Sequence, residues 1–391
     1  MRTSAIILNW LIALLWTWRS TIARRNLPKL PDLLKESITI EPASQPQITV
    51  IVPARNEEQA IESTLRSLLA QQDITLEILA VNDRSTDKTG EIMDRVAAEA
   101  HARNKSISVI HIQELPVGWI GKNHAMALAA RQATAPWLLF TDGDILFRED
   151  CLSHALSYAE READHLILFP TLILKSAGER MMLSAFQVLS FLSQRPWKVA
   201  DPKHRESIGI GAFNLIRNDV YRSIGGYEGH RMEVLEDIKL GYQVKRQGFR
   251  QRVAFGQDLI RVHWAAGALG IVRNLTKNVF AVFRFRPLML LAACIMVAVF
   301  CLTPFIGLFG PWQMLAASFL AIGSALEMYR YCERHINGVP TGYMLLLPIA
   351  ACIIVYMLLR SMVVTLAQGG VVWRGTFYPL TELRKNAGPL R

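Results

Sequence analysis

The segment Asp142-Gly143-Asp144 places two carboxylates on one short turn between apolar residues. It follows "LLFT" and comes before "ILF", so the carboxylates lie beside residues typical of a buried strand. Burying a carboxylate is costly unless a partner neutralises it. Hard oxygen ligands suit Mg²⁺ or Mn²⁺, which take one or two protein carboxylates and complete their shell with phosphates and water. Because Asp-Gly is also ordinary turn chemistry, Asp142 and Asp144 indicate a metal site only if other polar groups join them.

Asp83 ends another apolar stretch, in "LEILAVNDRSTDKT". A carboxylate at a strand end can accept hydrogen bonds from ribose hydroxyls or a base N–H. The alternative is a loop whose Asp87 or Thr86 merely caps the next helix. We assign capping to Asp87 and ligand contact to Asp83.

Arg55 and Glu57 follow Pro53 at the end of a third apolar stretch, "ITVIVPA". They could contact the same ligand, or form an ordinary surface ion pair. Lys122, in "GWIGKNHA", begins a predicted helix. An ammonium beside free backbone N–H groups favours phosphate there, although a solvated helix residue is an equally common reading.

Residues 208–248 hold a second informative group. Gly209 and Gly211 indicate bends or close approach of the backbone. Glu236 and Asp237 open a predicted helix, where acids commonly complement the helix dipole. That explanation is strong for Glu236. Asp237 is a candidate general base, because proton abstraction from an acceptor hydroxyl requires a second carboxylate.

Short strands alternate with helices around these residues, which predicts an α/β fold with a mostly parallel sheet of right-handed βαβ units. Ligands bind beyond the carboxyl ends of the strands in such sheets, so the polar segments above should face one cleft. The predicted strands are 48–54, 76–83, 107–112 and 137–142, and the predicted helices are 57–71, 87–102 and 121–134.

Apolar runs at both ends of the chain predict membrane helices. Residues 3–18 carry no charge and precede aromatic and basic residues, which favours an uncleaved anchor over a signal peptide. Residues 288–310 are uncharged and long enough to span a bilayer. Runs 312–326 and 343–359 are slightly short, and buried soluble helices are the alternative for the former.

Charge patterning predicts how the chain meets the membrane. The formal net charge is +10, and the basic residues concentrate beside the apolar runs, which fits lipid headgroups better than nucleic acid. The positive-inside bias puts the middle of the chain on the cytoplasmic side of a cell inner membrane. Three crossings after it would leave the tail, 369–391, outside, although that tail is also basic. Residues 266–287 are expected to form one interfacial amphipathic helix, with an ordinary core helix as the alternative.

The five cysteines are an odd number without a C-x-x-C motif, which argues against disulfides or a zinc site. Candidates for the rim of an acceptor site are aromatic or basic residues near the membrane segments. They are Arg195, Trp197, His263 and Trp264.

The motifs "IVPARNEE", "VNDRSTDKT", "TDGD" and "GGY…LEDIKLG" occur in the order and rough spacing of family 2 glycosyltransferases, which the chain resembles over about residues 48–256. "ELPVGWIGKNHAMA" and "VVWRGTFYPL" resemble the membrane-anchored branch associated with hopanoid and carotenoid genes, near ceramide glucosyltransferases. The resemblance implies a GT-A catalytic domain at 40–265, between an anchor at 1–25 and membrane helices at 288–368.

The resemblance also implies roles for the matching residues. Asp144 would bind the metal with Asp142, Asp237 would be the base, and Glu236 would support it. The donor site would comprise Pro53, Arg55, Glu57, Asp83, Lys122 and Asp142. The reaction would be inverting transfer of one sugar from a nucleotide sugar, UDP more than GDP, to a membrane lipid.

Alternatives stay open at this point. The Q-x-x-R-W motif of processive synthases is lacking, because "SQRPWKV" has the wrong spacing, so a single transfer is favoured over polymer synthesis. Basic residues at 195, 198, 203 and 205 keep a polyprenyl phosphate acceptor open. A non-catalytic membrane scaffold would be expected to have lost the carboxylates, which are all present.

Overall fold

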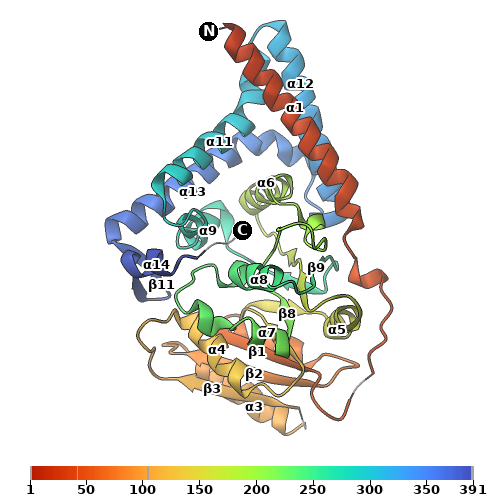
Figure 1. The fold of residues 1–391 in the computed structure, drawn as a ribbon, viewed down its shortest axis with the longest axis vertical. Helices are drawn as coiled ribbons and strands as arrows, with labels where there is room; N and C mark the ends of the chain where they lie inside the picture. The colour runs from red at the N-terminus through yellow and green to blue at the C-terminus, as the bar shows by residue number, and fades with distance from the viewer. Residues whose placement is uncertain (1, 42, 104, 389–391) are drawn as a thin grey trace. The chain divides into compact units, whose positions relative to one another are not determined.

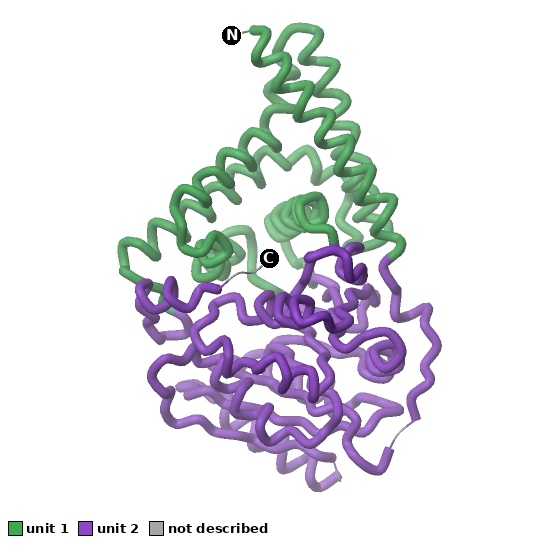
Figure 2. Tube along the Cα trace, viewed as in Figure 1, with its two compact units in different colours: residues 1–29, 173–195, 263–372 green, residues 30–172, 196–262, 373–391 purple. Residues whose placement is uncertain are grey.

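The computed structural model describes residues 2–41, 43–103 and 105–388 (Figure 1). The chain forms two compact units (Figure 2). Unit 1 combines residues 1–29, 173–195 and 263–372, and unit 2 combines residues 30–172, 196–262 and 373–391.

Unit 2 is built on a seven-stranded sheet of order β3-β2-β1-β4-β8-β6-β9. Strands β3, β2, β1 and β4 are parallel to one another, and β8 is antiparallel to both of its neighbours. The predicted mostly parallel α/β sheet is therefore confirmed. The strands of this sheet are β1 (Ile48–Ala54), β2 (Leu76–Asp83), β3 (Ile107–Ile112), β4 (Trp137–Phe140), β6 (His165–Leu168), β8 (Asn214–Arg217) and β9 (Gln251–Ala254).

A second sheet of three short strands has the order β5-β10-β7. These strands are β5 (Ile145–Phe147), β7 (Thr171–Leu172) and β10 (Ile260–Val262). Because β5 begins directly after Asp144, the Asp-Gly-Asp turn is held between a strand of each sheet. The helices of unit 2 are α2 (Ile61–Leu69), α3 (Thr89–His101), α4 (Gly121–Gln132), α5 (Cys151–Glu162), α7 (Asn218–Ser223), α8 (Glu236–Arg246) and α14 (Leu380–Asn386).

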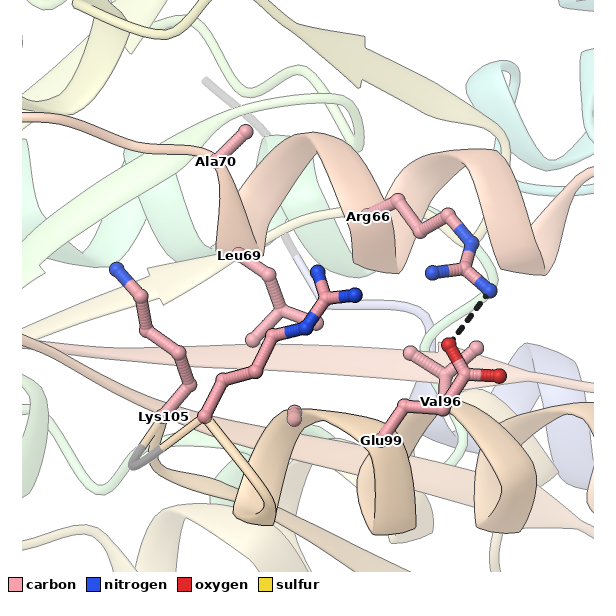
Figure 3. Close-up of a pocket in the computed structure, with 8 residues that line it drawn as sticks. Arg66, Leu69, Ala70, Val96, Glu99 and Lys105 are labelled. Atoms are coloured by element: carbon pink, nitrogen blue, oxygen red, sulfur yellow. Dashed lines mark hydrogen bonds and ion pairs between the residues drawn. The ribbon is translucent and has the colours of Figure 1, made fainter.

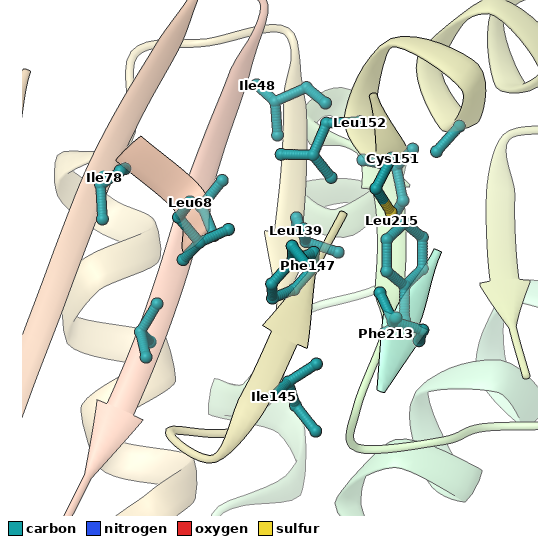
Figure 4. Packing of buried hydrophobic residues seen from close by; sticks show 14 of the residues in the cluster. Ile48, Leu68, Ile78, Leu139, Ile145, Phe147, Cys151, Leu152, Phe213 and Leu215 are labelled. Atoms are coloured by element: carbon teal, nitrogen blue, oxygen red, sulfur yellow. The ribbon is translucent and has the colours of Figure 1, made fainter. Parts of the chain in front are cut away.

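Apolar side chains from both sheets and from the helices fill the interior of unit 2. Leu139 of β4, Phe147 of β5 and Phe213 before β8 meet in one cluster with Leu68 of α2 (Figure 4). β1 is buried along its whole length, as expected for a central parallel strand covered on both faces.

Three predicted strands, 48–54, 76–83 and 107–112, have the observed limits of β1, β2 and β3. The helix predicted over 57–71 begins only at Ile61, since residues 58–60 form turns. The strand predicted over 137–142 ends at Phe140. Beyond it, the backbone N–H of Thr141 donates to the Ile51 carbonyl oxygen at 3.2 Å, and the Thr141 hydroxyl donates to the Ala212 carbonyl oxygen at 2.8 Å. These two contacts hold the chain just before Asp142.

Unit 1 is mainly helical. They are α1 (Arg2–Asn26), α6 (Ala177–Ser193), α9 (Gly267–Leu275), α10 (Val279–Val282), α11 (Pro287–Ile306), α12 (Trp312–Cys332) and α13 (Leu347–Gln368). α1 and α12 lie side by side (Figure 1). Asn9 donates to the Ser318 hydroxyl at 3.1 Å, and Arg24 pairs with Glu327 at 3.2 Å. These polar contacts fix how the two helices are aligned along each other.

Among the described residues, three helical segments are long and apolar enough to cross a membrane, namely 2–29, 287–309 and 341–368. They correspond to the predicted anchor and to two of the three predicted C-terminal runs. α12 contains the remaining run, 312–326, and continues to Cys332. The single helix predicted over 266–287 is instead two short helices, α9 and α10, separated by a turn.

After α13 the chain forms a hairpin of β11 (Gly370–Trp373) and β12 (Thr376–Pro379). From Trp373 onward the described tail belongs to unit 2. A basic tail was predicted here, but not its return to the unit that holds the sheet.

One surface hollow lies between α2 and α3 (Figure 3). Its lining includes Arg66, whose guanidinium is 2.9 Å from Glu99, and Lys105. Lys105 precedes β3, so the hollow reaches the amino end of the parallel strands. It is therefore at the opposite edge of the sheet from the predicted site.

Candidate functional site

The parallel strands bring the predicted polar segments to one edge of the sheet in unit 2. Asp83 ends β2, and Asp142 comes two residues after β4. Pro53 lies near the carboxyl end of β1, opposite Val81 in the ladder. A Cβ at Gly143 would lie 3.6 Å from the Pro53 carbonyl oxygen, so the ends of β1 and β4 are adjacent. The strand order predicted this juxtaposition.

Lys122 joins two segments that are far apart in the sequence. Its Nζ is 2.6 Å from Oδ1 of Asp142 and 2.7 Å from Oε1 of Glu236. Burial alone would lower the pKa of Lys122, but Asp142, Glu236 and Asp237 together raise the pKa well above its ordinary value. The ammonium group is therefore a permanent cation that ties the start of α8 to the turn after β4. In this structure Lys122 contacts carboxylates, and its expected role as a phosphate ligand remains a prediction.

Asp237 lies in the first turn of α8, where its Oδ1 accepts a 2.7 Å hydrogen bond from its neighbour's backbone N–H. Burial and the charge of Glu236 raise the pKa of Asp237 to about 7, although Lys122 acts in the opposite direction. A carboxylate that titrates near neutrality can accept a proton during turnover and release it afterwards, which is the property a general base needs.

Asp144 shares this electrostatic environment. Burial, followed by the charges of Asp142 and Glu57, raises the pKa of Asp144 to about 7, against the influence of Arg374 and Lys122. We call Asp142, Asp144, Glu236 and Asp237 the carboxylate cluster. These four carboxylates outnumber the ammonium group of Lys122. The excess of negative charge favours the binding of protons or of a cation.

The carboxylate cluster fits a divalent ion that is bound together with a phosphorylated ligand. Among the described residues, no group of three or more His, Cys, Asp or Glu side chains is arranged to hold a metal by itself. Mg²⁺ and Mn²⁺ commonly use only one or two carboxylates and take the remaining oxygens from phosphates and water. Asp142 and Asp144, two carboxylates on one turn with excess negative charge, meet that requirement.

Two glycines allow the backbone to approach the carboxylate cluster. A Cβ at Gly211 would lie 2.8 Å from Oδ2 of Asp142, and one at Gly209 would overlap the carbonyl group of Asp237. The sequence predicted bends or close approach of the backbone at both glycines. Any side chain at Gly209 would displace the start of α8, because its nearest neighbour there is backbone.

Asp83 is buried, with 4% of its surface exposed, and is held by an ion pair with the adjacent Arg84 at 2.7 Å. Burial lowers the pKa of Arg55, and the nearby positive charge of Arg84 lowers it further. Arg55 and Asp83, which were predicted to bind the donor, therefore lie in one region with a further guanidinium group, that of Arg84, which was not predicted.

Two residues of the C-terminal hairpin were not predicted as site residues from the sequence. Arg374 forms an ion pair with Glu57, and its Nη1 donates to the Arg55 carbonyl oxygen at 2.6 Å. Tyr378 accepts a 3.1 Å hydrogen bond from the backbone N–H of Gly121, where α4 begins. Both residues lie in "VVWRGTFYPL", a stretch that resembles a family motif. The stretch alone does not predict which distant residues Arg374 and Tyr378 contact.

The four acceptor candidates are divided between the two units. Trp197 belongs to unit 2, and the other three belong to unit 1. Nε2 of His263 lies 3.4 Å from a carboxylate oxygen of Glu179, and the Trp264 ring lies 6.0 Å from the ring of Phe186. Arg195 adjoins the C-terminal end of α6. Their acceptor role remains a prediction.

Glu179 is a buried carboxylate with a full set of donors. It accepts hydrogen bonds from the backbone N–H groups of Gly267 at 2.8 Å and Lys175 at 2.7 Å, and from the Ser176 hydroxyl at 3.0 Å. Burial acts to raise its pKa, but these hydrogen bonds and the nearby His263 outweigh burial and lower the pKa to about 2. The Ser176 hydroxyl caps the start of α6, because it accepts a hydrogen bond from the backbone N–H of Glu179 at 3.3 Å.

Together, the sheet order and the positions of the helices define a mostly parallel α/β domain of the GT-A type. Residues 49–225 match the model of glycosyl transferase family 2, so this part of the chain is similar to that family.

The chain is also similar to curated proteins and to solved structures. The chain is 25% identical over 198 residues to 4,4'-diaponeurosporenoate glycosyltransferase of Staphylococcus aureus, which is half of each chain. It therefore spans about half the length of the curated relatives it matches. A mannosyltransferase from Pyrobaculum calidifontis, solved with GDP-Man and Mn²⁺, is 19% identical with a TM-score of 0.50, over 93% of this chain and 98% of that one. This likeness supports the fold.

Proposed function

We propose that the protein transfers a single sugar, with inversion, from a nucleotide sugar to a lipid acceptor at a membrane surface. The observation that carries the proposal is the carboxylate cluster at the carboxyl edge of a family 2 domain. It combines a turn suited to a metal with a half-buried carboxylate, Asp237, whose pKa is raised to about 7.

Asp237 acts as the general base. The acceptor hydroxyl oxygen forms a bond to the anomeric carbon while the bond from that carbon to the diphosphate oxygen breaks, and the hydroxyl proton moves to the Asp237 carboxylate. Attack from the face opposite the leaving group inverts the anomeric centre. Glu236 and Lys122 position this base, because their 2.7 Å contact anchors the start of α8.

A divalent ion held by Asp142 and Asp144 would supply Lewis acid stabilisation of the departing diphosphate. Arg55 and Asp83, at the ends of β1 and β2, bind the nucleotide. The donor is a UDP-sugar in preference to a GDP-sugar.

The acceptor is a membrane lipid. Three helical segments suited to crossing a bilayer support this proposal, and so does the printed name of the Staphylococcus aureus relatives, which specifies 4,4'-diaponeurosporenoate. The basic residues that follow the first apolar run, among them Arg24 and Arg25, favour a cytoplasmic location for unit 2 at the inner membrane.

The proposal is tested by incubating the purified chain in detergent with Mn²⁺ or Mg²⁺, membrane lipid extract and a panel of radiolabelled nucleotide sugars. We expect label to move from one donor into one lipid fraction that withstands mild acid. Label in an acid-labile polyprenyl phosphate product would instead identify the alternative acceptor class. Absence of labelled lipid with every donor, from protein that binds nucleotide, would contradict lipid glycosylation.

A further inference from the structure

The turn of the C-terminal hairpin has an unusual backbone. Arg374 and Gly375 are the two residues between β11 and β12, and their φ angles are +49° and +78°. Positive φ at both positions is the requirement of a type I′ hairpin turn. Glycine adopts it freely, but arginine rarely does. The surrounding contacts therefore hold Arg374 in this conformation.

Those contacts attach the hairpin to the residues assigned to donor binding. Arg374 donates to the Arg55 carbonyl oxygen at 2.6 Å and pairs with Glu57. Nη1 of Arg55 donates in return to the Thr376 hydroxyl at 3.0 Å. On the next strand of the hairpin, the Tyr378 hydroxyl is 3.1 Å from the backbone nitrogen that begins α4. The hairpin thus contacts both the end of β1 and the start of α4.

The position of Arg374 matters because of the charges near it. The ammonium group of Lys122 contacts the carboxylate cluster directly. The positive charge of Arg374 also acts on Asp144, and it comes from a segment about 230 residues further along the chain. A donor diphosphate beside Asp144 would bring additional negative charge, which Lys122 alone cannot balance.

We propose that Arg374 is a donor-binding residue whose guanidinium group contacts the diphosphate of the nucleotide sugar. The inference rests on the proposed function. A guanidinium group offers parallel N–H donors that match phosphate oxygens, and Glu57 holds it in place beside the site. Arg55 and Tyr378 position the hairpin, so the tail completes the site.

The competing explanation is that Arg374 only fastens the tail to unit 2. The two roles differ in which part of the nucleotide depends on the residue. A diphosphate ligand changes the affinity for nucleoside diphosphates and leaves the affinity for the corresponding nucleoside unaltered. A purely structural residue changes both affinities together, because it alters the shape of the whole site.

The test measures binding to the full chain in detergent with Mn²⁺ by calorimetry, using UDP, GDP, uridine and guanosine. For Arg374→Gln we expect the preferred nucleoside diphosphate to bind about 10- to 100-fold more weakly, as for loss of charge-assisted hydrogen bonds. The nucleoside should bind as it does to the parent protein. Arg374→Lys retains the positive charge but lacks the two parallel N–H donors of a guanidinium group. It should therefore bind the nucleoside diphosphate more tightly than Arg374→Gln and more weakly than the parent protein. Arg384→Gln, an exposed arginine in α14, is the matched control and should bind as the parent does.

Unchanged diphosphate affinity in Arg374→Gln would overturn the inference while leaving the proposed function standing. Equal losses for diphosphate and nucleoside would also overturn it, in favour of a structural role. If the parent protein binds neither nucleoside diphosphate, the proposed function fails, and the inference fails with it.

Discussion

Two acidic sites in this protein have opposite electrostatic character. Asp144 and Asp237 of the carboxylate cluster have a pKa raised to about 7, whereas the pKa of Glu179 in unit 1 is lowered to about 2. Burial acts in the same direction on all three. The difference comes from neighbours, because Glu179 receives hydrogen bonds from backbone and hydroxyl donors, while the cluster residues repel one another.

The neighbours of an acidic side chain therefore distinguish a chemical role from a structural one. A carboxylate whose donors are complete, such as Glu179, is stable as an anion and has little tendency to take up a proton or a metal. Carboxylates that share one ammonium group remain short of positive charge. A metal ion, a transferred proton or a cationic ligand can supply the missing positive charge.

The largest expected effect tests the functional side of this contrast. Asp237→Asn should lower the turnover rate by about 10²- to 10⁴-fold, the usual contribution of a positioned base, with the donor KM changed only a few-fold. Steady-state kinetics with labelled donor measures both quantities. Asp219→Asn removes an acid from the first turn of α7 and should leave both quantities unaltered. A matching rise in donor KM for Asp237→Asn would show that the residue is structural.

Changes at the turn formed by Asp142, Gly143 and Asp144 test the same contrast through the requirement for metal. Asp144→Asn is expected to raise the Mn²⁺ concentration for half-maximal rate by on the order of tenfold or more, because one of two carboxylate ligands is lost. Chelator treatment of the parent protein should abolish activity, and added Mn²⁺ should restore it. Full activity after chelation would remove the metal from the proposal.

The glycine that supports α8 offers a geometric test. Gly209→Ala should lower activity about 10²-fold, because a Cβ there displaces the Asp237 backbone and misplaces the base. Gly229→Ala is the control, since a Cβ at that position has no neighbour within 4 Å. Similar activity of the two variants would show that the start of α8 tolerates movement.

The smallest expected effect concerns Glu179 and is confined to stability. Glu179→Gln should reduce the free energy of unfolding by about 1.5–3 kcal/mol at pH 7, through loss of hydrogen bonds to a charged group. Because the folded pKa is depressed, the anion stabilises the protein above pH 4.5, and this contribution disappears as the pH falls toward 2. The difference in thermal midpoint between parent and variant should shrink over that range, while activity at pH 7 per folded molecule is retained. A midpoint difference independent of pH would show that the carboxylate charge plays no part.

Local patterns allowed much of unit 2 to be predicted. The limits of β1 and β2 follow from continuous apolar runs that end in polar residues, and the parallel order brings Asp83 and Asp142 to one edge. β8 could not be placed from sequence, because its antiparallel insertion beside β4 depends on pairing partners that lie more than 70 residues away.

The long-range contacts of the site were also beyond local inference. Lys122 has the same helix-start context whether it meets phosphate or carboxylates, and only the fold shows that it bridges Asp142 and Glu236. Arg374 appeared as part of a basic tail, since its contacts with the end of β1 span most of the chain. The break between α9 and α10 was missed because apolar and basic residues continue through it.

The return of the tail to unit 2 constrains the membrane topology by parity. Residues 196–262 and the described part of the tail from Trp373 onward share one compact unit, so both must lie on one side of any bilayer the chain enters. The polypeptide therefore traverses that bilayer an even number of times between Val262 and Trp373. At least one of the three long helices α11, α12 and α13 consequently enters and leaves by the same leaflet, or stays at the surface.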